Sequence, residues 1–284
     1  MQQHQSHCIG ERAPAGKPAA ATIGCPTNLY KWRARYNVVV RVAVTLVLLP
    51  LLLAAADPAK FEYACSPEDV EAFGLTCSEE EPCPVFLELA SVDTSGPRVF
   101  VSGNLHTTSV TLYGILLTSE DGGITWAEPN GRLHAAALDE IQFADFEHGW
   151  VSGVKLEPLP RDPFLLITTD GGKTWKPTPL LEETRYGSIQ QFWFDSVKTG
   201  ELILEGSKGA GTVYERYTTS AGGASWNLKE SGSKPLQLSK NRTQDSAGWR
   251  VRADAPSKTY RIERRVNDKW EAVSSFPVEA GVCK

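Results

Sequence analysis

The stretch Ser119-Glu120-Asp121-Gly122-Gly123-Ile124-Thr125-Trp126 occurs a second time as Thr168-Thr169-Asp170-Gly171-Gly172-Lys173-Thr174-Trp175. A weaker third copy, residues 219–226, keeps Gly223 and Trp226 but has alanine in place of the acid. Trp270 marks a candidate fourth unit without the motif. The four tryptophans are 49, 51 and 44 residues apart. A period of 40–50 residues is typical of propeller blades and solenoids.

Each period contains short apolar segments in the same order. Two predicted strands precede a variable loop, a third leads into the repeated motif, and its tryptophan begins a short fourth strand. No helical periodicity is present, so the fold class is all-β. Closing such units into a ring covers most sheet edges, and we expect a β-propeller of about four recognisable four-stranded blades. The first three strands of the first three units are 85–89, 99–103 and 113–117, then 140–143, 150–153 and 164–167, then 189–194, 202–206 and 213–217.

The motif Ser/Thr-x-Asp-x-Gly-x-Thr-Trp resembles the Asp-box (BNR-type repeat) of sialidase-related β-propellers. With Gly149-Trp150-Val151-Ser152-Gly153 upstream of the second copy, the chain is most similar to propellers of the photosystem II assembly-factor kind. The resemblance covers residues 86–280, with two complete motifs and one partial one. It implies a propeller fold and an assembly or carbohydrate-related role.

The residue types of the motif point to a structural role. An aspartate in a tight turn accepts hydrogen bonds from backbone N–H groups, glycine permits positive φ, and a tryptophan fills space between sheets. We therefore expect no catalytic residue, metal or cofactor here. The structural residues are Ser119, Asp121, Gly123, Thr125 and Trp126 in the first copy, Thr168, Asp170, Gly172, Thr174 and Trp175 in the second, and Gly223 and Trp226 in the third.

Residues 1–56 form a separate N-terminal segment. A polar stretch is followed by Lys31, Arg33 and Arg35, and then by an apolar run that ends in Ala54-Ala55-Ala56. A basic flank, a short apolar run and small residues at the exit are typical of a secretory signal. We expect export to the periplasm or the outside, with cleavage after Ala56; a membrane anchor over residues 38–56 and a buried helix are the alternatives.

Export would leave four cysteines in an oxidising compartment, Cys65, Cys77, Cys83 and Cys283, which suggests two disulfides. Three pairings are open. We favour Cys65–Cys77, which would staple a short helix, and Cys83–Cys283, which would join the two ends of a closed ring. Their spacing does not fit a zinc site.

Residues 57–85 form a cysteine-rich collar before the propeller domain, residues 86–284. Ser66 and Pro67 predict a helix start, and Gly74 predicts its end. The run Glu79-Glu80-Glu81 predicts a solvated turn.

Charge excludes one class of partner. Six of the 29 Lys and Arg residues and one of the 34 Asp and Glu residues fall in residues 1–56, which leaves an acidic body of net charge −10. Because nucleic-acid binding depends on neutralising phosphates, we expect no nucleic-acid partner. Contact with a membrane would come only through the N-terminal segment, if it is not cleaved.

Function is expected on the face opposite the motif, where the loops between the second and third strands differ in length and chemistry. The proline-rich loop 156–163 is the best candidate for partner contact, through Leu156, Pro158, Leu159, Pro160 and Arg161. We expect a non-enzymatic protein-binding or assembly module whose partner is an unidentified protein of the cell envelope. It would act as a monomer or as a dimer that completes the ring.

The alternative is a carbohydrate-active propeller, a sialidase-like hydrolase or a lectin. Sialidase chemistry requires an arginine cluster, an acid and a Tyr–Glu pair. The chain has an arginine-rich tail, but this tail is confined to the last unit, where alternation predicts that its arginines lie on a solvent face: Arg250, Arg252, Arg261, Arg264 and Arg265. The pattern therefore favours a protein without enzymatic activity.

Overall fold

The computed structural model describes residues 59, 61–157, 159–208, 211–238, 240 and 248–284. Contacts divide the chain into Met1–Leu52 and Leu53–Lys284, and every described residue belongs to the second unit. The expected signal or anchor in residues 1–56 lies outside the described residues. Within the described part, no helix has both the length and the apolar character to cross a membrane.

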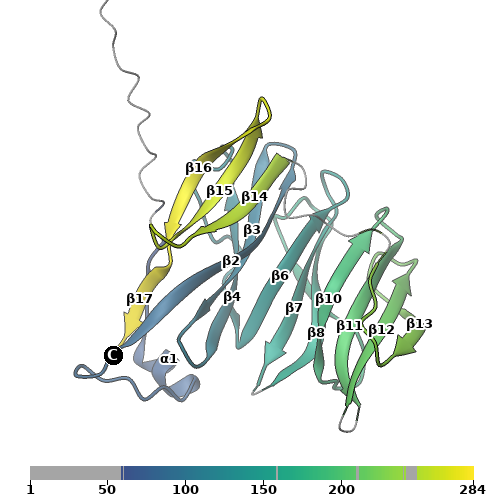
Figure 1. Ribbon diagram of the computed structural model, residues 1–284, viewed down its shortest axis with the longest axis horizontal. Coiled ribbons are helices and arrows are strands. Elements are labelled where there is room, and N and C mark those ends of the chain that lie inside the picture. Colours follow the sequence, from purple (N-terminus) through teal and green to yellow (C-terminus); the bar gives the residue numbers. More distant parts are fainter. Residues whose placement is uncertain (1–58, 60, 158, 209–210, 239, 241–247) are drawn as a thin grey trace, which may run out of the picture. The chain divides into compact units, whose positions relative to one another are not determined.

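The described residues form four sheets, which are antiparallel except for the short parallel pairing of β1 with β17 (Figure 1). Sheet I has the order β1-β17-β2-β3-β4-β5, and the other three sheets follow the chain order of their strands. Sheet I contains β1 (Tyr63–Ala64), β17 (Glu279–Cys283), β2 (Cys83–Ser95), β3 (Arg98–His106), β4 (Thr111–Ser119) and β5 (Leu133–His134); sheet II contains β6 (Ala136–Phe143), β7 (Gly149–Leu156), β8 (Pro160–Thr168) and β9 (Lys176–Pro179); sheet III contains β10 (Gly187–Phe194), β11 (Gly200–Lys208), β12 (Gly211–Thr219) and β13 (Asn227–Gly232); sheet IV contains β14 (Trp249–Asp254), β15 (Thr259–Val266) and β16 (Lys269–Pro277).

The sheets pack face to face, and sheet II shows why the sequence permits this. Phe164 and Leu166 of β8 point toward sheet I, where they join a core with Phe100 of β3. Leu165, between them, joins the core of sheet III with Leu204 of β11. A strand buried on both sides reads as a continuous apolar run, as residues 164–167 do. Sheet II therefore lies between sheets I and III.

Sheet IV packs against sheet I rather than following sheet III in space. Trp249, Ile262 and Phe276 share a core with Val85 and Leu117 of sheet I. The strand β17, which comes directly after β16, then pairs with β2 and so joins the end of the chain to sheet I. Four sheets of up-and-down strands packed in this way are consistent with a β-propeller. Sheet IV has three strands, so the expected four-stranded repeat holds only for the first three units among the described residues.

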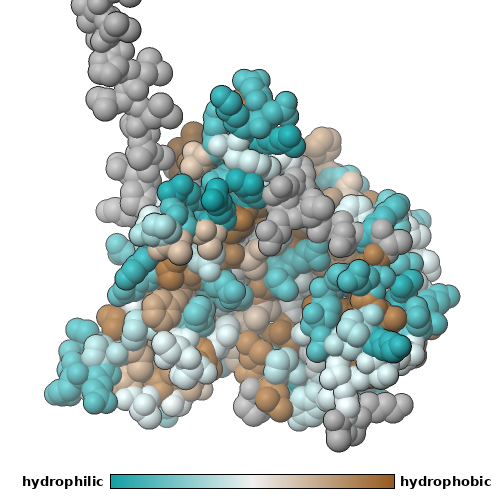
Figure 2. All heavy atoms as spheres, viewed as in Figure 1, coloured by the Kyte–Doolittle hydropathy of each residue, from teal (hydrophilic) through white to brown (hydrophobic). Residues whose placement is uncertain are grey.

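The predicted helix forms as α1 (Pro67–Ala72). Ser66 caps it in a capping box with Asp69, and the chain leaves the helix through Gly74, whose φ is 59°. The hydroxyl of Tyr113 on β4 donates to Asp69 at 2.5 Å, which attaches the helix to sheet I. The glutamates of the following turn, 79–81, are exposed, and this turn is hydrophilic in Figure 2.

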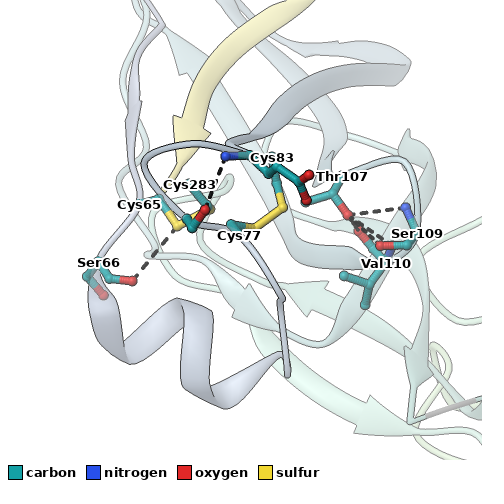
Figure 3. The surroundings of a disulfide bond; sticks show 10 residues. Cys65, Ser66, Cys77, Cys83, Thr107, Ser109, Val110 and Cys283 are labelled. Carbon is teal, nitrogen blue, oxygen red and sulfur yellow. Dashed lines mark hydrogen bonds between the residues drawn. A yellow bond between two sulfur atoms is a disulfide. The ribbon is translucent and has the colours of Figure 1, made fainter.

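The favoured disulfide pairing is wrong. The bonds are Cys65–Cys283, with Cα atoms 5.0 Å apart, and Cys77–Cys83, with Cα atoms 5.4 Å apart (Figure 3). The reason is the short parallel pairing of β1 with β17, which matches Ala64 with Val282 and so brings Cys65 beside Cys283. Cys77 then bonds across the turn after α1. No local spacing predicts the β1–β17 pairing, because 218 residues separate the two cysteines.

Candidate functional site

The first copy of the repeated motif is a closed network of hydrogen bonds. Asp121 Oδ1 accepts from the backbone N–H of Ile124 at 3.0 Å and of Thr125 at 2.9 Å, and Thr125 Oγ1 donates to Asp121 Oδ2 at 2.6 Å. Ser119 Oγ donates to Asp121 Oδ1 at 2.8 Å and accepts from the N–H of Gly123 at 2.7 Å. The bonds to Thr125 hold the pKa of Asp121 well below its usual range. All of these hydrogen bonds join residues of the same turn, so they stabilise its conformation.

The second copy repeats the network, and the third keeps part of it. Asp170 accepts from Thr174 Oγ1 at 2.6 Å and from the N–H of Thr174 at 3.0 Å, which lowers its pKa to about 2. In the third copy, Thr219 Oγ1 accepts from the N–H groups of Ala221 at 3.0 Å and of Gly223 at 3.1 Å. The loss of the acid therefore removes the bonds to the end of the turn and keeps those to its start.

Each copy lies against the neighbouring sheet. Gly172 has a φ of 81°, and a Cβ there would lie 2.4 Å from the ring of Phe100 on sheet I. Trp126 and Trp226 donate their indole N–H groups to the carbonyls of Gly123 and Gly223, at 3.0 and 3.1 Å. The motifs thus occupy the contacts between sheets, at the end of each sheet that we call the box face.

The predicted partner loop lies at the opposite end, which we call the loop face. It is shorter than expected, because β7 extends to Leu156 and β8 begins at Pro160, and these two residues pair across the hairpin. Leu156 is half-buried and donates its N–H to the carbonyl of Ala135. Leu159 is 61% exposed and Pro160 is also exposed, whereas Arg161 is half-buried and donates to Glu157 at 2.9 Å. Pro158 lies outside the described residues.

The crossing from β9 to β10 joins this loop, and no sequence signal linked the two. Arg161 and Tyr186 form an isolated antiparallel bridge. Asp162 donates its N–H to the carbonyl of Arg185 at 2.8 Å and accepts from the N–H of Arg185 at 3.2 Å. Tyr186 is 48% exposed. We call the group of exposed Leu159, Pro160 and Tyr186 with half-buried Arg161 the loop-face patch.

Arg185 also connects the patch to sheet III through an ion pair. Its guanidinium lies 2.6 Å from the carboxylate of Glu215 on β12, which is buried. The hydroxyl of Tyr217 donates to the same carboxylate at 2.9 Å, and burial together with this bond raises the pKa of Tyr217 to about 12. A tyrosine with so high a pKa stays protonated at neutral pH. The Tyr–Glu pair is therefore part of the support for the patch.

A groove of about 910 Å³ continues from the patch along the outer strand of sheet II. Its floor includes Pro177 and Pro179 of β9 and Leu180 and Leu181 of the crossing. Trp226 of the third motif closes one side, and the far wall comes from β5. Asp162, Glu182 and Glu183 lie on its rim, so an apolar floor has a mainly acidic border.

A smaller pocket of about 270 Å³ lies beside the first strands β2, β6 and β10. Glu88 and Asp139 line it, and Asn104 donates to Glu88 at 3.3 Å and to the carbonyl of Leu138 at 3.1 Å. Burial and the nearby carboxylate of Glu88 raise the pKa of Asp139. The sequence did not indicate this pair, because the two residues are far apart along the chain. No cluster of three metal-ligating side chains occurs among the residues that the structure describes.

The arginines of the last unit lie mostly on one face of sheet IV, as alternation predicted. Arg252 and Arg261 are cross-strand partners, and Arg261 also pairs with Asp254. Arg250 lies 2.6 Å from buried Glu263 and 4.2 Å from the ring centroid of Trp270. Most of these guanidinium groups thus have partners within the sheet.

No known protein family and no curated protein matches the chain. Solved structures do. YCF48 bound to a D1 peptide is 19% identical over 76% of this chain and 60% of its own, with a TM-score of 0.38. A PL25 ulvan lyase bound to a sulfated sugar is 10% identical over 70% of this chain and 52% of its own, with a TM-score of 0.39. The α-L-arabinofuranosidase ARB93A from Fusarium graminearum is 10% identical over 74% of this chain and 60% of its own, with a TM-score of 0.38. The chain thus spans three fifths or less of the length of these proteins, one of which is bound to a peptide and two of which are carbohydrate-active enzymes.

Proposed function

We propose that this protein is a non-enzymatic binding module that holds a protein partner of the cell envelope on its loop face. The observation that carries this proposal is the placement of two exposed apolar side chains, Leu159 and Tyr186, on backbone that is fixed to the sheets. A few residues contribute most of the energy at protein interfaces, and tyrosine and arginine, both present in the patch, are enriched among them. An already ordered surface loses less conformational entropy on binding.

The surroundings of the patch support the same function. Arg161 and Glu157 form an ion pair near Leu159 in the hairpin, and Asp162 and Pro163, which follow Arg161 on β8, line the groove. An apolar centre with a polar border is the usual composition of a protein interface. The network of Asp162, Arg185 and Glu215 keeps the backbone of the patch in place without using its exposed side chains.

The experiment is cross-linking and pull-down from the native envelope with the full chain as bait. Leu159→Asp and Tyr186→Asp should each reduce recovery of the specific partner about tenfold or more, because a charge replaces an apolar contact. Ile124→Asp is the matched control, since Ile124 is 70% exposed on the box face. Equal recovery with all three variants would place the binding surface elsewhere. Sedimentation of the wild type would separate a monomer from a ring-completing dimer.

A carbohydrate-active function is the second candidate, and one observation favours it. Asp139 has a raised pKa beside a second carboxylate, Glu88, in a polar pocket. Such a pair is the chemical requirement of many glycosidases and of some sugar-binding sites. A glycan array and a hydrolase assay test it directly. Glycan binding or turnover that Asp139→Asn abolishes and Leu159→Asp leaves intact would favour this function over the first.

A further inference from the structure

Four cysteines meet at the end of the C-terminal strand. Figure 3 shows the Cys65–Cys283 and Cys77–Cys83 bonds beside each other where β17 ends, next to α1. Four different segments bring them together: Cys65 follows β1, Cys77 follows α1, Cys83 begins β2 and Cys283 ends β17. The two bonds are therefore neighbours in the structure.

The register of the strands gives Cys283 a second potential partner. β17 and β2 run antiparallel, and Cys283 lies directly opposite Cys83. Residues directly opposite in an antiparallel pair have side chains on the same face and Cα atoms about 4.5–5.5 Å apart. A disulfide forms when Cα atoms are about 4.4–6.8 Å apart. Cys283 is thus within bonding reach of Cys83 as well as of Cys65, to which it is bonded.

The two bonds differ in how easily a reductant reaches them. Cys77 and Cys83 are both half-buried and close a short turn with a separation of six residues. In the other bond Cys65 is also half-buried, but Cys283 is completely buried, with an exposure of 0%, so only one of its two sulfurs can be reached. Because thiol–disulfide exchange requires access of a thiolate to sulfur, a dissolved dithiol should attack the Cys77–Cys83 bond first.

We propose that this cluster is a thiol–disulfide exchange site, in which the bond of Cys283 passes from Cys65 to Cys83. A dithiol reductant first reduces Cys77–Cys83, supplying two electrons and becoming a disulfide itself. The Cys83 thiolate then attacks Cys283 Sγ, the Cys83–Cys283 bond forms, and Cys65 leaves as a thiolate. This second step transfers no net electrons. The products are the Cys83–Cys283 bond and free thiols at Cys65 and Cys77.

The exchange leaves β17 covalently joined to the sheet and removes the covalent bond between β17 and the segment that contains β1 and α1. The bond to Cys65 closes a loop with a separation of 218 residues, and a bond to Cys83 closes one of about 200, so both constrain the unfolded chain to nearly the same degree. After exchange, β17 remains bonded to β2. The segment with β1 and α1 is then held by the short β1–β17 pairing, by the Tyr113–Asp69 hydrogen bond and by the stacking of Phe73 on His134 at 4.3 Å.

Limited reduction of the wild type tests the order of events. The folded full chain is titrated with dithiothreitol, free thiols are trapped by alkylation, and the remaining bonds are identified by non-reducing peptide mapping. The expected intermediate has a Cys83–Cys283 peptide with alkylated Cys65 and Cys77. An intermediate with alkylated Cys77 and Cys83 and an intact Cys65–Cys283 bond would overturn the proposal, as would loss of both bonds in a single step.

Two matched variants test the exchange without any reductant. Cys77→Ser and Cys83→Ser both remove the short bond and both leave one free thiol near the cluster. Only Cys77→Ser leaves the thiol on Cys83, opposite Cys283, so it should show at least about tenfold more alkylated Cys65 than Cys83→Ser, because the attack is intramolecular. Circular dichroism confirms that both variants are folded. Equal labelling of Cys65 in the two variants would contradict the proposal.

Discussion

Trp126 and Ser274, which are 148 residues apart, are joined by a hydrogen bond of 3.1 Å from the indole N–H to the hydroxyl oxygen. Trp126 ends the first motif, and Ser274 lies on β16 of sheet IV. The ring of Trp126 also meets Phe276 of the same strand edge-on, with centroids 5.7 Å apart. The first motif therefore attaches the last sheet to the first, whereas the second motif meets the neighbouring sheet through the edge-on contact of Trp175 with Phe100.

Removing the Ser274 hydroxyl should weaken this attachment. Ser274 is 4% exposed, and Ser274→Ala leaves the Trp126 N–H with the carbonyl of Gly123 as its one remaining acceptor. We expect a loss of about 1 kcal/mol in the free energy of unfolding, measured by urea denaturation. Ser275→Ala, at a half-buried neighbour on the same strand, should change it by less than about 0.5 kcal/mol. Equal effects of the two changes would refute the assignment.

Restoring the acid in the third motif should stabilise the chain. Ala221 occupies the place of Asp121 and Asp170, and Ser225 occupies the place of the threonine that donates to them. Ala221→Asp should recover bonds to the end of the turn and raise the free energy of unfolding by about 1 kcal/mol. Glu120→Asp, outside the network of the first motif, is the control and should have little effect. A melting temperature unchanged in Ala221→Asp would show that the acid is not needed in this turn.

The motif aspartates should make stability fall in acid. The pKa of Asp170 is about 2 in the folded chain because Thr174 donates two hydrogen bonds to its carboxylate. A folded pKa below the unfolded value of about 4 stabilises the fold above pH 4, and this contribution disappears as the pH falls toward 2. Melting temperatures between pH 2 and 5 should therefore fall less steeply in Asp170→Asn than in the wild type. Parallel curves would contradict the assignment.

The support of the loop-face patch should depend on one buried carboxylate. Arg185→Met removes the cation beside Glu215, whose side chain is 8% exposed and still accepts a hydrogen bond from Tyr217, and should cost about 3 kcal/mol in the free energy of unfolding. Arg185→Met combined with Glu215→Gln should cost less than the sum of the single changes, because the two residues are in contact. Arg265→Met, at an exposed pair with Asp268, should change stability by less than about 1 kcal/mol. An additive double variant would show that the pair is not coupled.

Most strands of the first three sheets could be predicted from the sequence, because their pattern is local and repeated. The apolar run at residues 164–167 predicted a strand, and it lies within β8. The capping residues Ser66 and Pro67 likewise predicted α1. The fourth unit was harder to predict, since it lacks the motif and its sheet has three strands among the described residues.

The candidate site was predicted less well. Leu159 and Arg161 were identified from a variable, proline-rich loop, but Tyr186 and Arg185 come from the crossing to the next sheet. They meet the loop mainly through backbone hydrogen bonds, and such bonds cannot be predicted from the types of the residues involved. The carboxylate pair of Glu88 and Asp139 was missed for the same reason, because it exists only where two first strands lie side by side.

The amino-acid sequence by itself determined the all-β class, the repeat and the turns that end each unit, since all of these depend on contacts within a few residues. Tertiary structure alone decided the partners of the cysteines, the packing of sheet IV on sheet I and the composition of the loop-face patch. These depend on which distant strands pair, and Cys283 bonds to Cys65 rather than to the expected Cys83 because β1 lies beside β17. The repeated motif is the part of the structure that contacts between neighbouring residues explain most completely.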